Sequence, residues 1–164
     1  IGVHRNGHGG AVLHVAECAY RYHAVQTDDF DLGVRALGVK GIVERDGHVL
    51  VGRRGPRVAQ YRGWWELVPG GVAEPNEPPA ETIVRELEEE AGLSTIGEPV
   101  ALAALFDEHI RCWEIVYRLR ADATINHPPP PTEEFPEMRW CRPDALPEPS
   151  TPIARRVAEF VAQR

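Results

Sequence analysis

The clearest periodic pattern lies in residues 71–93. Apolar residues recur there every three or four positions, which places them on one side of an α-helix. The stripe consists of Ala80, Ile83, Val84, Leu87 and Ala91. We expect the helix to begin near Pro78, because proline is favoured at a first helical position, with Asn76 or Glu77 as its cap. Gly92 is expected to end it, as glycine commonly does.

Short runs rich in apolar and β-branched residues on both sides of this helix predict strands. The predicted strands cover residues 35–44, 48–53, 64–68, 100–106, 112–120 and 138–141. Asp46 and Gly47, between the first two strands, are typical of a tight hairpin turn. The run Pro69-Gly70-Gly71 is expected to break the chain before the helix.

The hydrophobic patterns that predict secondary structure are weaker at both ends of the chain. Residues 151–163 predict an amphipathic helix with Thr151 as its cap and Pro152 in its first turn. Its predicted apolar face holds Ile153, Val157, Phe160 and Val161. Residues 11–26 have no clean period, and their valines and tyrosines favour a strand. We expect residues 1–30 to form a partly flexible N-terminal extension that supplies an edge strand or contacts in a homodimer.

The order of these elements is mixed strands, a helix, more strands and a second helix, which predicts an α+β layered domain. We place this domain at residues 31–164, after the extension. A chain of 164 residues is long enough for one such domain with a sizeable core. The first residue is Ile1, so we expect the natural chain to begin earlier.

Composition narrows the class of protein. The net charge of −7 disfavours broad binding to a nucleic acid duplex, which requires a basic surface. Three widely spaced cysteines indicate neither a disulfide framework nor a zinc cluster. No apolar run approaches the roughly 18 residues that a membrane span needs, and no signal peptide is recognisable. We therefore expect a cytoplasmic protein without a membrane segment.

Three carboxylates lie together on the predicted helix, beside its apolar stripe. Glu86, Glu89 and Glu90 are neighbours because residues three and four apart share a helix face. Like charges at this spacing repel one another, unless a divalent cation lies between them. Glutamate runs are also common on solvated helix surfaces, so the carboxylates alone leave a plain surface helix as an alternative.

The spacing around these carboxylates resembles the Nudix box. That pattern is a glycine, five residues, a glutamate, seven residues, and then Arg-Glu-aliphatic-any-Glu-Glu-any-Gly-aliphatic. Every specified position is filled here, by Gly71, Glu77, Arg85, Glu86, Leu87, Glu89, Glu90, Gly92 and Leu93. The resemblance covers most of the chain from about residue 35 onward. It implies the family's α/β/α sandwich with a mixed central sheet.

The resemblance also implies roles for the residues of the box. Glu86 and Glu90 would hold the main metal ion, which would be Mg²⁺ with Mn²⁺ as the alternative, and the backbone carbonyl of Gly70 could add a ligand. Glu89 would be a further metal ligand or the catalytic base. Arg85 would orient a catalytic glutamate through a salt bridge, for which an ordinary exposed helix pair is the alternative.

Residues outside the box supply further candidates. Many family members use another acid from a late loop, and Glu134 is preferred here over Glu133, Asp107 and Glu108. Arg53 and Arg54 are candidates for binding substrate phosphates, because arginine suits phosphate contact. Aromatic residues that could stack on a nucleobase are Trp64, Trp65, Tyr61 and Phe106, of which Trp64 is the preferred substrate-binding residue.

We therefore predict a Mg²⁺-dependent pyrophosphohydrolase that cleaves a nucleoside diphosphate linked to another group. Nucleoside triphosphates, ADP-ribose and nucleotide sugars all remain open as its small-molecule substrate. A non-hydrolytic nucleotide sensor is the main alternative, although such domains have usually lost box carboxylates. An isomerase of isopentenyl diphosphate shares the fold, but none of the three cysteines lies in a matching context.

Overall fold

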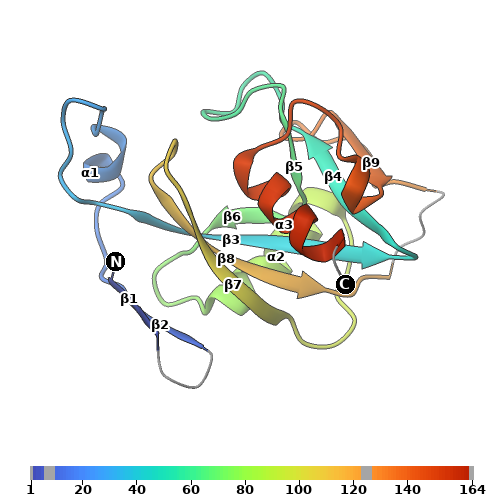
Figure 1. Ribbon diagram of the computed structural model, residues 1–164, viewed down its shortest axis with the longest axis horizontal. Helices are drawn as coiled ribbons and strands as arrows, with labels where there is room; N and C mark the ends of the chain where they lie inside the picture. The colour runs from blue at the N-terminus through green and yellow to red at the C-terminus, as the bar shows by residue number, and fades with distance from the viewer. Residues whose placement is uncertain (1, 6–9, 123–126, 163–164) are drawn as a thin grey trace.

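The computed structural model describes residues 2–5, 10–122 and 127–162 (Figure 1). Its strands are β1 (Gly2–Arg5), β2 (Ala11–His14), β3 (Ala36–Arg45), β4 (His48–Arg53), β5 (Trp65–Leu67), β6 (Gly70–Val72), β7 (Val100–Asp107), β8 (Cys112–Leu119) and β9 (Glu137–Cys141). Its helices are α1 (Arg21–Ala24), α2 (Pro79–Ala91) and α3 (Pro152–Ala162), with a short 3₁₀ turn, η1 (Pro143–Ala145).

A mixed sheet forms the centre of the molecule. Its main path has the order β5-β4-β3-β8-β7, while β6 pairs with β3 and β9 pairs with β4. The long strands β3 and β8 run parallel over eight residue pairs, from Ala36 opposite Cys112 to Val43 opposite Leu119. The other pairings in this sheet are antiparallel. The sheet thus has the mixed character that the family resemblance implied.

Two separate cores show that helices cover both faces of this sheet (Figure 1). Alternate residues of β3 serve the two sides, as the period of a strand requires. Val39 and Val43 pack in the core that contains α2 residues Ile83 and Leu87. Ile42 packs in the core that contains Ile153, Ala154 and Val157 of α3. The predicted α+β class and α/β/α sandwich are confirmed.

In the central sheet the strands follow the predictions closely, with one exception. The tight turn at Asp46 and Gly47 has a positive φ at both residues, 48° and 73°, as the expected hairpin type requires. Residues 70–72, however, were predicted as part of a break and form strand β6. Gly70 and Gly71 pair there with Lys40 and Val39 of β3. This run is too short and too poor in side chains to be recognised by periodicity.

Both helices occur where the pattern predicted them. Helix α2 ends at Gly92, whose φ of 62° is the left-handed conformation that favours glycine. The predicted cap was wrong, because Pro78 occupies the N-cap position and no side chain caps the helix. In α3, Thr151 Oγ1 accepts a hydrogen bond from the amide of Ala154 at 3.4 Å, which confirms that cap. Phe160 was expected on the apolar face but remains 48% exposed.

The N-terminal segment differs most from the prediction. Residues 11–26 are not one strand, because β2 is followed by loop and by the one-turn helix α1. Strands β1 and β2 form their own two-stranded sheet, which lies away from the central sheet in Figure 1. Gln26 organises the chain that follows, since its side chain accepts hydrogen bonds from the amides of Leu32 and Val34. In the part of the chain that the structure describes, no helix is long and apolar enough to cross a membrane.

Candidate active site

The three carboxylates predicted on one helix face differ in their exposure. Glu86 and Glu90 turn inward from α2, with the Glu86 side chain 15% exposed and Glu90 buried. Glu89 points outward, and its side chain is 58% exposed. The two remaining glutamates of the helix, Glu81 and Glu88, are exposed as expected. The helix thus offers two inward carboxylates with a third at their outer rim.

Arg85 links these carboxylates and the loop before the helix. Its Nε and Nη2 donate to the two oxygens of Glu77, each at 3.1 Å. Its Nη1 lies 3.1 Å from Glu86 Oε1 and donates to Glu89 Oε2 at 3.0 Å. This bidentate contact with Glu77 ties the loop to the helix, since an arginine fork matches a carboxylate. The guanidinium also fixes the direction of two candidate metal-binding side chains.

Burial makes the ionised forms of the inward carboxylates costly. The pKa of Glu86 is raised mainly by burial, which Arg85 opposes and the charges of Glu89 and Glu134 reinforce. The pKa of Glu90 is raised well above its usual value, again mainly by burial, with Lys40 opposing and Glu134 adding to the shift. Glu134 therefore approaches both residues from another part of the chain. A cation among these three acids would remove their mutual repulsion.

Two glycines of β6 allow these groups to approach the sheet. A Cβ atom on Gly71 would collide with the Glu86 carboxylate, and one on Gly70 would collide with the Lys40 side chain. The amide of Gly70 donates a hydrogen bond to Glu90 Oε2 at 3.0 Å. Strand β6 therefore separates Lys40 from α2: Glu86 packs against Gly71, and Gly70 contacts both Glu90 and Lys40.

A cavity of about 200 Å³ lies on the Lys40 side of this strand. It is lined by residues of β3, β5, β6, β8 and the intervening loops, and its polar lining includes Lys40, Arg54, Tyr61, Glu66, Glu114 and Glu134. Gly70 and Gly71 line this cavity and also contact Glu90 and Glu86, so the cavity and the inward carboxylates of α2 adjoin the same strand.

A chain of ion pairs runs along one side of the cavity. The buried Lys40 ammonium bonds to Glu66 Oε1, and Arg54 Nη1 lies 3.2 Å from Glu66 Oε2 and 3.3 Å from Glu134 Oε1. Burial opposes the charge on Glu66, but Lys40 and Arg54 outweigh it and lower the pKa of this carboxyl. Burial likewise opposes the charge on Lys40, and the nearby Glu66 and Glu114 raise its pKa overall. The network therefore remains ionised, and Arg54 holds Glu134 at the cavity lining.

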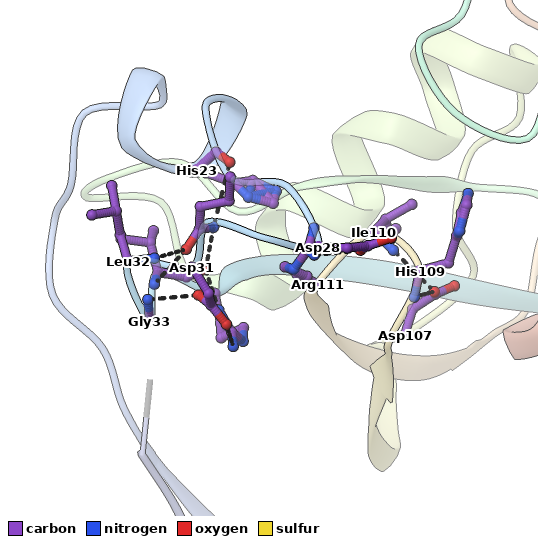
Figure 2. Close-up of polar contacts among 12 residues, drawn as sticks. His23, Asp28, Asp31, Leu32, Gly33, Asp107, His109, Ile110 and Arg111 are labelled. Atoms are coloured by element: carbon purple, nitrogen blue, oxygen red, sulfur yellow. Dashed lines mark hydrogen bonds and ion pairs between the residues drawn. The ribbon is translucent and has the colours of Figure 1, made fainter.

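Tyr61 and Asp107 form the opposite wall. The Tyr61 hydroxyl donates to the buried Asp107 carboxylate, at 2.9 Å and 2.8 Å from its two oxygens. The same carboxylate accepts hydrogen bonds from the amides of His109 and Ile110, which Figure 2 shows at the turn between β7 and β8. The Tyr61 ring also contacts Trp64, with 5.5 Å between ring centroids. Asp107 is therefore a fully bonded structural acid.

Some predicted site residues lie outside the cavity lining. Arg53 is exposed, and its Nη1 is 4.0 Å from Glu137. Trp64 supports Tyr61 from behind and does not line the cavity. Glu133 pairs with Arg57 at 2.7 Å, and both side chains are largely exposed. Of the two late-loop acids, Glu134 is the one that the fold brings to the site.

Sequence reasoning missed three charged residues of the cavity: Lys40, Glu66 and Glu114. Each lies inside a strand that reads as apolar. The missed signal was the charge itself, because a buried strand seldom carries one unless it is paired or functional.

Whether this site suits a divalent metal ion depends on the oxygen atoms that could act as its ligands. Within the described ranges, no group of three or more acidic, histidine or cysteine side chains is arranged to hold a metal ion. The Arg85 guanidinium and the Gly70 amide hold the carboxylates of Glu86, Glu89 and Glu90 instead. Oxygen donors of this kind, two of them turned inward at Glu86 and Glu90, nevertheless match the ligand preference of Mg²⁺.

Comparisons with known proteins show the family to which the chain belongs. A family model described as the NUDIX domain matches residues 34–163, so the chain belongs to that family. A CTP pyrophosphohydrolase of Escherichia coli (strain K12) is 45% identical over 64 residues, which cover 38% of this chain and 46% of that protein. An RNA pyrophosphohydrolase of Erythrobacter litoralis (strain HTCC2594) is 29% identical over 158 residues, which cover 83% of this chain and 93% of that protein.

Solved structures show the same fold. A MutT NUDIX hydrolase from Burkholderia pseudomallei aligns with a TM-score of 0.62 at 26% identity, covering 77% of this chain and 97% of that one. The chain spans only about half the length of the first curated relatives that it matches, 46% and 57%.

Proposed function

We propose that this protein hydrolyses nucleoside triphosphates to the monophosphate and pyrophosphate, with Mg²⁺ as its metal ion and Mn²⁺ as a substitute. One observation carries the proposal: Glu86 packs against Gly71 and Glu90 accepts a hydrogen bond from Gly70, and both glycines line a cavity with buried charges. The names of the two pyrophosphohydrolase relatives support release of pyrophosphate. The net charge of −7 favours a small nucleotide over a long polyanion.

In this proposal Glu86, Glu90 and the backbone carbonyl of Gly70 hold the metal, and Glu89 joins them from the rim. The bound metal neutralises phosphate oxygens and lowers the pKa of water. Arg85 keeps Glu86 and Glu89 in position, as partners of metal ligands generally do.

Glu89 or Glu134 accepts the proton from the attacking water. Glu134 is the better placed of the two, because Arg54 holds it at 3.3 Å beside both the inward carboxylates and the cavity. Arg54 is also proposed to meet a substrate phosphate. Arg53 and Trp64 are not carried into the proposal, since neither lines the cavity.

A non-hydrolytic sensor is the competing function. The complete set of box carboxylates argues against it, because a sensor has no need to keep inward acids whose pKa values burial raises. Three free cysteines agree with a reducing, cytoplasmic location. A homodimer through the N-terminal extension is proposed on its exposed apolar side chains, among them Tyr20, Val25 and Phe30.

The test is a product assay across a panel of nucleoside triphosphates, ADP-ribose and nucleotide sugars, with and without Mg²⁺ or Mn²⁺. We expect metal-dependent release of pyrophosphate from triphosphates. Glu90→Gln should abolish it, while Glu81→Gln, on the exposed face of the same helix, should not. Strong turnover of ADP-ribose without turnover of any triphosphate would refute the substrate class. Binding without turnover of any compound would favour the sensor.

A further inference from the structure

A second cavity, distinct from the candidate active site, lies between the N-terminal extension and the loop that precedes α2. We call it the extension cavity. Residues 15–20 and His23 line one side of it, and residues 34–37 and 72–79 line the other. Its volume is about 850 Å³, and it adjoins the 200 Å³ cavity at Val72, which lines both. Binding pockets for whole small molecules occupy roughly 300–1,000 Å³, so this volume suits a complete small molecule.

Much of the lining of the extension cavity is apolar. Apolar side chains come from both of its sides, among them Val15, Ala16, Ala19, Val34, Leu37 and Ala73. The apolar part of a ligand would leave water on entering the cavity, which is favourable in proportion to the area that it buries. The ligand therefore needs an apolar body.

The charged side chains of the lining leave an excess of negative charge. Arg35 is already paired, because its two terminal nitrogens donate to both oxygens of Asp31, at 2.8 Å and 2.5 Å. Glu77 is likewise paired with Arg85. Glu74 is not held in this way, since its side chain is 68% exposed and lies 4.0 Å from Arg85. Glu17 is exposed and forms no ion pair in the described part of the chain. These two carboxylates favour a cation.

The other polar groups of the lining also call for a hydrogen-bond donor. Helix N-termini attract anions through free amide N–H groups, but Pro78 and Pro79, which line the cavity at the start of α2, have none. The next amides, of Glu81 and Thr82, already donate to the Pro78 carbonyl. The buried Nδ1 of His23 has no hydrogen-bond partner among the described residues, and an ammonium N–H can supply one.

We propose that the extension cavity binds a small organic amine, whose apolar body fills the cavity and whose ammonium group lies at the carboxylates of Glu17 and Glu74. A phosphate-bearing ligand would face the same two carboxylates, so this site differs in chemistry from the candidate active site. A second copy of the chain fits the cavity less well, since both copies carry a net charge of −7 and the same acidic side chains. Val25 and Phe30, on which the homodimer is proposed, lie outside the lining.

The probe for the experiment is tryptamine, which carries a protonated amine on a flat apolar ring. Proton–nitrogen NMR spectra of the protein, recorded during a titration without nucleotide or metal, measure its affinity and locate it. We expect the amide signals of Ala19, Leu37 and Ala73, which come from both sides of the cavity, to shift together. Methylammonium keeps the charge without the ring, and indole-3-propionate keeps the ring with the opposite charge. Each should bind roughly tenfold more weakly than tryptamine, or weaker still.

Substitutions of the two exposed acids test the role of their charge. Glu17→Gln together with Glu74→Gln should weaken tryptamine binding by roughly threefold to tenfold, as expected for two exposed ion pairs. Glu17→Lys together with Glu74→Lys should reverse the preference, so that indole-3-propionate binds more tightly than tryptamine. Glu159→Gln, an exposed charge change on α3, should keep the wild-type affinity.

Three results would overturn the proposal. They are equal affinities for tryptamine and indole-3-propionate, signal shifts confined to other parts of the chain, and no binding of tryptamine at millimolar concentration. Because the titration contains no nucleotide and requires no hydrolysis, each of these results can be distinguished from a failure of the proposed function.

Discussion

The buried carboxyl of Glu114 predicts a specific dependence of stability on pH. Its pKa is raised from 4.5 to about 7 in the folded protein. Between these values the folded state holds the proton more tightly than the unfolded state, so the free energy of unfolding falls as pH rises. The difference of 2.5 pKa units, 7 − 4.5, corresponds to about 3 kcal/mol at about 1.36 kcal/mol per unit. That stability is fully present below about pH 4.5 and is lost by about pH 7.

Glu114→Gln removes this dependence while keeping the shape of the side chain. We expect the free energy of unfolding of the variant, minus that of the wild type, to rise by about 3 kcal/mol between pH 5 and pH 8. Urea unfolding followed by tryptophan fluorescence, in metal-free buffer, measures both proteins. The exposed Glu159→Gln serves as the control and should parallel the wild type. Parallel curves for Glu114→Gln and the wild type would refute the burial of this acid.

Three further substitutions test the architecture of the site. Gly71→Ala places a methyl group against the Glu86 carboxylate. The affinity for Mn²⁺, measured by electron paramagnetic resonance, should therefore fall by roughly tenfold. An unchanged affinity would show that Glu86 does not bind metal from this position. Arg85→Ala frees the carboxylates that the arginine holds in the wild type. We therefore expect kcat to fall by roughly 10–100-fold while thermal stability changes little. Full activity would mean that Arg85 only forms ordinary surface ion pairs. Tyr61→Phe removes the hydroxyl that donates a hydrogen bond to the buried Asp107. The free energy of unfolding, measured by urea titration, should therefore fall by about 1–3 kcal/mol. An unchanged free energy of unfolding would contradict this hydrogen bond.

Local spacing made part of the site predictable. Glu86, Glu89 and Glu90 could be assigned to one helix face because their separation alone fixes it. The end of the helix at Gly92 could also be predicted from the local sequence. Even so, the spacing did not reveal that Glu90 is buried and Glu89 exposed. That difference depends on where the sheet lies relative to the helix, which no local pattern contains.

The cavity was not predictable because distant segments build it. The parallel pairing of β3 with β8 places Gly38 opposite Glu114, and this register joins residues 76 positions apart, 114 − 38. The pairing of β5 with β4 places Glu66 opposite Gly52 and so brings it to the cavity. Strand β6 was missed for the same reason, since two glycines have no pattern until β3 pairs with them. Pairing partners of this kind are a property of the whole fold.

The proposed function requires the inward carboxylates of α2 to hold a metal ion on which hydrolysis depends. Mn²⁺ binding and pyrophosphate release from CTP can be measured in the same preparations of wild type, Glu90→Gln and Glu88→Gln. We expect Glu90→Gln to lose both by roughly a hundredfold or more, and the exposed Glu88→Gln to keep both. Pyrophosphate release by Glu90→Gln at the wild-type rate, or turnover by the wild type in chelator, would contradict it.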